Sequence, residues 1–207
     1  MRIQFIQNFI NIFKKQYTNE KRIIRGENNK IVKNPKLDIG IQIFGNNNQI
    51  LIDEDITYFC ANIYIGTFDC YVNNCLVSIG KNSMAHGVEI RLLEDDSTVE
   101  IGEDCLFSSN INIDCSDTHA IFDCNSLELL NVGKSVKIGN HVWIGKNVTV
   151  CKNTEISDNS VVGTGSIVTK KFSKPNSIIA GIPADIKKEN INWSTLRPKQ
   201  YLESLNK

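Results

Sequence analysis

The chain has 207 residues, 41% of them hydrophobic, and its 23 lysines and arginines equal its 23 aspartates and glutamates. This length suffices for one substantial domain with terminal additions. The balanced charge removes the electrostatic case for nucleic acid or an anionic membrane as the main partner. Seven cysteines, an odd number without a paired CxxC arrangement, indicate neither a disulfide framework nor a zinc site. They favour a reducing compartment, and we expect a cytoplasmic protein.

Residues 1–35 are predicted to form an N-terminal amphipathic helical segment. Its apolar residues recur at helical spacing: Ile3, Phe5, Ile6, Phe9, Ile10 and Phe13. Polar residues interrupt this series, so we expect neither a signal peptide nor an integral membrane segment. A helix that covers the end of the main domain is the preferred interpretation, and a membrane-surface anchor with Lys14 and Lys15 at its basic end is the alternative.

A six-residue period dominates the second half of the chain. Large apolar residues stand six apart at Ile138, Ile144, Val150, Ile156, Val162 and Val168. Apolar or small residues follow the first five of these by four places, at Val142, Val148, Thr154, Ser160 and Ser166. This period matches neither the 3.6-residue turn of an α-helix nor the two-residue alternation of a strand. Glycines at 139, 145 and 163 suit corners where a side chain would crowd the backbone.

Three six-residue sides make one turn of a solenoid, so residues eighteen apart should stack, as Ile138 on Ile156. The pattern predicts an all-β fold, a parallel β-helix of hexapeptide repeats whose coils lie ~4.8 Å apart. Ile79-Gly80 and Ile101-Gly102 repeat the motif, and we expect the β-helix to span residues 36–183. Cys60 and Cys105 then occupy small inward positions and are interpreted as buried hydrophobic residues.

The period stops after Cys115, and residues 116–135 are predicted to protrude as a loop. His119 lies in this loop. An exposed imidazole with an ordinary pKa near ~6.5 can accept a proton at neutral pH. Taken by itself, an ordinary surface histidine is the simpler interpretation.

Residues 184–207 are predicted to form a C-terminal cap with a short helix around 201–205, because Pro198 prevents one helix through the whole segment. Trp193 is expected to pack on the last coil. A cap would protect strand edges that otherwise invite aggregation.

Four segments, read in order, resemble a known family: "FSSNINIDCSDTHAIFD" (107–123), "IGNHVWIGKNVTV" (138–150), "VVGTGSIVTK" (161–170) and "SIIAGIPADIKKENINW" (177–193). They are similar to the hexapeptide acyltransferases that acetylate bacterial surface polysaccharides, including capsular sialic acid O-acetyltransferases. The resemblance implies a left-handed β-helix, a homotrimer with active sites between subunits, and acetyl-CoA as co-substrate in the groove between neighbours. It implies no metal.

The resemblance also assigns residues. His119 matches the catalytic histidine, which would take the proton of a sugar hydroxyl while the oxygen attacks the thioester directly. Asp117 is preferred over Asp123 as the carboxylate that orients this imidazole, and a turn-forming role is the alternative for each. Trp143 should point outward and matches a tryptophan that lines the acetyl-CoA site; a trimer-contact aromatic is the alternative.

Further coenzyme A contacts are expected at two corners and one lysine: Gly145, Gly163, Thr164, Ser166 and Lys171. One departure from the family stands out. Where relatives often read Gly-Asn-Pro-Ala-Lys, residues 181–185 read Gly-Ile-Pro-Ala-Asp, so a carboxylate replaces an expected basic contact. Lys187 or Lys188 could substitute.

The expected function is acetyl-CoA-dependent O-acetylation of a sugar hydroxyl in a bacterial surface polysaccharide or its precursor. One alternative is N-acetylation of an amino sugar nucleotide, which would give a product stable to mild alkali. The other is a noncatalytic β-helix scaffold, in which His119 and Trp143 would be replaceable.

Overall fold

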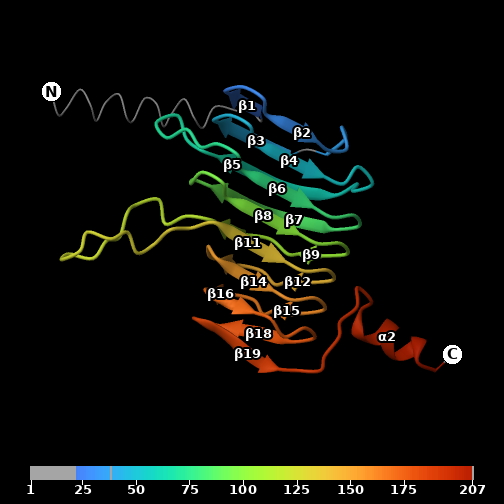
Figure 1. The fold of residues 1–207 in the computed structure, drawn as a ribbon. Coiled ribbons are helices and arrows are strands. Elements are labelled where there is room, and N and C mark those ends of the chain that lie inside the picture. The colour runs from blue at the N-terminus through green and yellow to red at the C-terminus, as the bar shows by residue number, and fades with distance from the viewer. Residues whose placement is uncertain (1–21, 38, 207) are drawn as a thin grey trace, which may run out of the picture.

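The computed structural model describes residues 22–37 and 39–206, and these form a column of stacked strands (Figure 1). The predicted N-terminal helix falls in residues 1–21, outside the described residues. One sheet has twelve strands: β1 (Arg22–Arg25), β3 (Ile39–Phe44), β5 (Phe59–Ile65), β7 (Met84–Leu92), β9 (Leu106–Phe107), β10 (Ile111–Asp114), β12 (Trp143–Ile144), β13 (Thr149–Val150), β15 (Val161–Val162), β16 (Ile167–Val168), β18 (Ile178–Gly181) and β19 (Ala184–Lys188). The other sheet has seven: β2 (Lys30–Val32), β4 (Gln49–Ile52), β6 (Leu76–Ile79), β8 (Thr98–Ile101), β11 (Ser135–Ile138), β14 (Thr154–Ile156) and β17 (Lys171–Phe172).

The lower coils have three walls, each a ladder of short strands. Wall A holds β9, β12, β15 and β18; wall B holds β10, β13 and β16; wall C holds β8, β11, β14 and β17. Neighbouring coils pair in parallel, with Ile138 opposite Ile156, Ile144 opposite Val162 and Val150 opposite Val168. The predicted stacking of residues eighteen apart is therefore confirmed.

The interior is filled by the inward member of each side. Ile144, Val150 and Ile156 are completely buried. Small polar residues in the second inward position bond the nearby backbone, as Thr154 Oγ1 does by donating to the Cys151 carbonyl at 2.8 Å. This bond satisfies a hydroxyl that would otherwise be costly to bury. The hydrophobic effect thus stabilises a narrow core of buried side chains that runs along the column.

Asparagine side chains form ladders along the corners. Asn28, Asn47 and Asn74 adopt positive φ, a conformation that asparagine tolerates better than other non-glycine residues. Asn28 Nδ2 donates to Asn47 Oδ1 at 3.3 Å, and Asn47 Nδ2 donates to Asn74 Oδ1 at 3.3 Å. These contacts explain why the corner sequences are rich in asparagine.

The column begins earlier than the predicted boundary at residue 36. Strands β1 and β2 already pair in parallel with β3 and β4, and Ile24 lies opposite Ile43. The interval of nineteen residues between these two isoleucines departs from the regular repeat, which hid this coil from the six-residue period. The expectation that Cys60 points inward is also wrong. Its side chain is exposed, next to a register shift between Phe59 and Ala61, whereas Cys105 is buried as predicted.

Two segments leave the column. Residues 115–134, between β10 and β11, project from one side and carry one antiparallel bridge, between Phe122 and Leu129 (Figure 1, yellow-green). At the C-terminal end, β19 pairs antiparallel with β18, and helix α2 (Pro198–Ser204) lies beside the lower coils. The helix starts at the proline because proline is favoured in a first helical turn. No helix among the described residues is long and apolar enough to span a membrane.

Replacing Ile156 with alanine tests the stacked core. The side chain is fully buried and lies between Ile138 and Phe172 on wall C. We expect Ile156→Ala to lower the free energy of unfolding by about 2–5 kcal/mol, measured by denaturant titration, because it opens a cavity in a rigid interior. Lys137→Ala, an exposed neighbour on the same wall, is the control. Equal effects of the two changes would contradict a packed interior.

Candidate active site

The protruding loop (residues 115–134) is fixed at its root by Glu94. One carboxylate oxygen of Glu94 accepts a hydrogen bond from Ser116 Oγ at 2.7 Å, and the other accepts one from the Gly133 amide at 3.0 Å. The two legs of the loop are thereby tied to the same side chain. Glycine is required at 133, because a Cβ there would lie 2.0 Å from the Cys115 carbonyl oxygen.

His119 lies in the first leg of this loop with its side chain exposed. Its backbone is held: the His119 amide donates to the Asp117 carbonyl at 2.8 Å, and its carbonyl accepts from Asn131 Nδ2 at 2.9 Å. Within the described part of the chain, its imidazole has no hydrogen-bond partner. The ring is thus presented on a fixed backbone with both nitrogens open to a ligand.

Asp117 makes different contacts from those expected. Its carboxylate accepts from Asn131 Nδ2 at 2.9 Å and pairs with Lys152, which projects from the next coil. The hydrogen bond from Lys152, followed by that from Asn131, lowers the pKa of Asp117. Asp117 therefore anchors the loop in this structure and does not hold the imidazole. Asp123 accepts from the amides of Asn125 and Ser126, both at 2.8 Å, and so has the turn-forming role.

Trp143 points outward from wall A, as expected, with 38% of its surface exposed. It has an aromatic neighbour that the sequence placed elsewhere. The Trp193 ring lies 6.0 Å from that of Trp143 and stacks on His141 at 4.3 Å and 8°. Trp193 Nε1 also donates to the His141 carbonyl at 2.8 Å. Trp193 therefore packs two coils above the predicted last coil, and no periodic signal relates positions 141 and 193.

The glycine corner supports stacking more than ligand binding. The Gly145 amide donates to the Val162 carbonyl and the Gly163 amide donates to the Ile179 carbonyl, both at 2.8 Å. These bonds occupy the backbone N–H groups of two residues that were expected to contact coenzyme A. A Cβ at Gly145 would lie 2.7 Å from the Thr164 nitrogen, so glycine allows the close approach of two coils. Thr164 remains exposed at this corner.

Two of the expected cofactor residues lie apart from Trp143. Ser166 is 1% exposed, and its hydroxyl donates to the Gly163 carbonyl at 2.6 Å and accepts from the Gly181 amide at 3.2 Å. Its side chain is thus an interior residue. Lys171 is exposed but belongs to β17 on wall C, opposite Glu155. The unusual Asp185 pairs with Lys170 at 3.2 Å, so one carboxylate and one cation compensate each other there.

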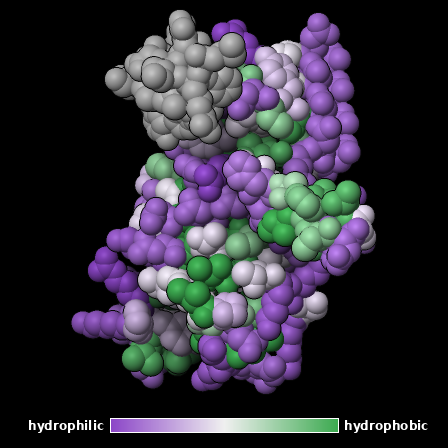
Figure 2. Space-filling model, turned by 90° about the vertical axis from the view of Figure 1, so that its left-hand side faces the viewer, coloured by the Kyte–Doolittle hydropathy of each residue, from purple (hydrophilic) through white to green (hydrophobic). Residues whose placement is uncertain are grey.

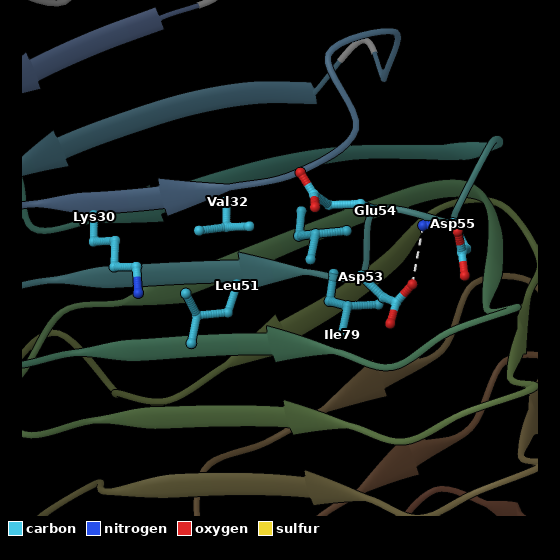
Figure 3. Close-up of a pocket in the computed structure, with 8 residues that line it drawn as sticks. Lys30, Val32, Leu51, Asp53, Glu54, Asp55 and Ile79 are labelled. Atoms are coloured by element: carbon cyan, nitrogen blue, oxygen red, sulfur yellow. Dashed lines mark hydrogen bonds between the residues drawn. The ribbon is translucent and has the colours of Figure 1, made fainter.

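The two principal site residues belong to different parts of the chain. The loop with His119 leaves the column where wall B ends and wall C begins, whereas Trp143 stands on wall A. A pocket of about 610 Å³ lies elsewhere, among the upper coils (Figure 3). Lys30, Leu51 and Asp53 line it, together with Val32, Ile52, Glu54, Asp55 and Ile79. None of the predicted site residues lines this pocket.

Comparison with known proteins agrees with the hexapeptide-repeat fold. Residues 135–170 match the family model described as bacterial transferase hexapeptide (six repeats). The crystal structure of the polySia specific acetyltransferase NeuO is 27% identical, covers 88% of this chain and 97% of its own, and gives a TM-score of 0.70. The polysialic acid O-acetyltransferase OatWY is 28% identical, with coverages of 89% and 97% and a TM-score of 0.60. The search of curated proteins found no match.

A more distant structure shares only the fold. The N-acyltransferase AntD from Bacillus cereus, as a mutant in complex with dTDP and coenzyme A, is 18% identical, with coverages of 92% and 95% and a TM-score of 0.51. The likenesses confirm the predicted resemblance to hexapeptide-repeat acyltransferases. They support an acetyltransferase as the class of this enzyme.

Replacing Lys152 tests the anchoring of the loop. The pKa of Asp117 is lowered mainly by Lys152, so the bond stabilises the folded loop above the unfolded pKa near ~3.9 and is lost as pH falls through the folded pKa. We expect Lys152→Met to raise the pKa of Asp117, measured by NMR titration. Lys146→Met, an exposed lysine one coil corner away, is the control. An unchanged Asp117 titration in Lys152→Met would contradict the pairing.

Proposed function

We propose that this chain is an acetyl-CoA-dependent O-acetyltransferase that acts on a sugar hydroxyl of a bacterial surface polysaccharide or its precursor. The observation that carries the proposal is the free His119 imidazole on an anchored loop beside a hexapeptide column. The likeness to two polysialic acid acetyltransferases supports sugar hydroxyls as the acceptor class.

His119 acts as the general base. A neutral ring nitrogen accepts the proton of the acceptor hydroxyl as the oxygen attacks the thioester carbonyl. The tetrahedral intermediate collapses with loss of the coenzyme A thiolate, and the imidazolium returns the proton to that thiolate. The products are an acetyl ester and coenzyme A, and no acyl-enzyme forms. Asn131 keeps the His119 backbone in place through this cycle, since its side chain binds the His119 carbonyl.

Trp143 and Trp193 supply the apolar surface for the pantetheine arm of acetyl-CoA. The coils below them supply the positive field that its phosphates require. Residues 133–207 contain twelve lysines and arginines but five aspartates and glutamates. The co-substrate therefore lies with its phosphates toward the lower coils and its thioester toward the loop. Thr164 and Lys146 flank the corner that this path crosses; Lys171 contributes to the field from wall C.

The active site forms between subunits of a left-handed β-helical homotrimer. His119 lies in the loop between walls B and C and Trp143 lies on wall A, so we expect a neighbour's loop to meet this chain's Trp143. Figure 2, in which the loop side faces the reader, shows hydrophobic residues gathered at the height of the loop. Six large apolar side chains are exposed there: Ile121, Phe122, Leu127, Leu129, Leu130 and Val132. Burying them against a neighbour would remove a patch that a monomer would leave in water. The protein would act in the cytoplasm, where acetyl-CoA is available.

Replacing His119 tests the mechanism. We expect His119→Ala to reduce the rate of coenzyme A release by about 10²–10⁴-fold, because the general base is lost. The measurement follows free thiol with acetyl-CoA and a panel of oligosaccharides. His86→Ala, at another exposed histidine, should retain the rate. Equal rates for wild type and His119→Ala would favour the scaffold, and a product stable to mild alkali would show an amide.

Replacing Trp143 tests the co-substrate site. We expect Trp143→Ala to weaken coenzyme A binding about tenfold, corresponding to ~1.4 kcal/mol, because an exposed aromatic contact is lost. Isothermal titration calorimetry on the assembled protein measures this loss. Tyr201→Ala, at an exposed aromatic residue of α2, should bind like wild type. The alternative, a subunit-contact role for Trp143, predicts dissociation of the oligomer in light scattering without coenzyme A.

A further inference from the structure

The chain's charges are segregated along the column although they balance overall. Residues 50–132, which form the middle coils and nearly all of the loop, contain fifteen aspartates and glutamates but only two cations, Lys81 and Arg91. The coils below carry the opposite excess. The loop with His119 therefore belongs to the acidic part of the chain and lies next to the part that carries excess positive charge.

Both cations of this acidic part are already paired. Lys81 Nζ lies 3.3 Å from a carboxylate oxygen of Glu103. Arg91 Nε lies 2.6 Å from Asp114 and 3.6 Å from Glu89. In residues 50–132, all of which the structure describes, neither lysine nor arginine is left without a carboxylate.

Lys152, a cation next to the protruding loop, is paired as well. Lys152 reaches the loop from below, and its ammonium group binds Asp117, two residues before His119. Lys134, the last residue of the loop, is exposed. Along the sequence, it is the cation nearest to His119 for which the structure shows no carboxylate partner.

Uncompensated carboxylates stand over the loop root. Glu94 binds both legs of the loop through neutral donors, Ser116 Oγ and the Gly133 amide, so its charge persists. Asp95 and Asp96 follow it at the same corner and are exposed. Asp95 accepts from the Asn73 amide at 2.7 Å, and Asp96 accepts from Asn74 Nδ2 at 3.1 Å; both donors are neutral.

We propose that the acceptor is an uncharged saccharide and that anionic saccharides are discriminated against at the acceptor side of the site. This proposal rests on the proposed function and narrows its substrate class. A carboxylated sugar approaching His119 would meet a negative potential, and Lys152, the cation bound to Asp117, is already paired. Like-charge juxtaposition slows encounter and disfavours the wrong partner. The acceptor class would then differ from that of polysialic acid acetyltransferases, despite the common fold.

A matched pair of acceptors tests the proposal. Oligosialic acid and its methyl ester offer the same hydroxyls and differ in charge. Thiol release from acetyl-CoA is followed for both, and for uncharged maltose and N-acetylglucosamine oligomers, at low and high salt. We expect kcat/KM to be about tenfold or more higher for an uncharged acceptor than for oligosialic acid at low salt, with the difference shrinking as salt screens the field. A higher kcat/KM for oligosialic acid, falling with salt, would overturn the proposal while leaving the acetyltransferase function intact.

Isosteric variants locate the cause. Asp95→Asn, Asp96→Asn and Glu128→Gln, combined, remove three exposed charges and keep side-chain oxygen acceptors at each position. We expect this triple variant to gain several-fold in kcat/KM on oligosialic acid at low salt and to change less than about twofold on the methyl ester. Lys134→Gln should leave both values unchanged. A loss confined to oligosialic acid in Lys134→Gln would show an anion contact and overturn the proposal.

Direct binding separates the inference from the function. Should no acceptor release thiol, the proposed function fails, and the charge preference is then measured by equilibrium dialysis of the same oligomers against the wild-type protein with coenzyme A. Tighter binding of oligosialic acid than of its ester would overturn the inference. Weaker binding that recovers with salt would support it.

Discussion

The structure depends on the stacking of successive coils, in which each inward side chain lies directly on the one a turn before. A slip of one residue would turn every inward side chain of a wall outward, so the register of the lower coils is strongly fixed. Ile138, Ile156 and Phe172 form one such stack on wall C. The upper coils vary in length but keep parallel strand pairing, with one register shift between Phe59 and Ala61 in the pairing of β5 with β7. A rigid column of this kind gives any loop that leaves it a defined starting point.

The repeating parts of the fold could be predicted from the sequence. Contacts that depend on which coil lies beside a non-repeating segment could not. Ile144 and Val162 could be paired from their spacing, and the break after Cys115 indicated the loop. Contacts between a regular coil and a segment outside the repeat carry no period. Trp193 on His141 and Lys152 on Asp117 are of this type, since each joins chain positions whose spatial relation appears only when the coils are counted. Ser166 shows the converse: its inward position followed from the repeat and leaves no surface for a ligand.

The candidate site combines a hydrogen-bonded loop backbone with the His119 imidazole, which has no hydrogen-bond partner among the described residues. Hydrogen bonds hold the root of the loop and the backbone of His119. The His119 imidazole is exposed and makes no hydrogen bond to the described residues. A polar group left without an internal partner on an ordered loop is available for chemistry at little cost to stability. His119 lies in the loop between walls B and C, whereas Trp143 stands on wall A. Under the proposed function, a contact between subunits that buried the loop's apolar residues would also unite the two halves of the site.

Anchoring of the loop and the charge around it have a common origin in Glu94. Its two oxygens accept from Ser116 Oγ and from the Gly133 amide. A glutamine there would keep an oxygen for the Gly133 amide, and its NH₂ group could donate to Ser116 Oγ, because a hydroxyl accepts as well as donates. The anchoring of the loop therefore depends on a side chain with two polar ends at 94 rather than on its negative charge. The same holds at Asp95 and Asp96, since asparagine keeps the single oxygen that each uses. The charge at these three positions can then change without loss of the bonds that place His119, which is what adaptation to an anionic acceptor would require.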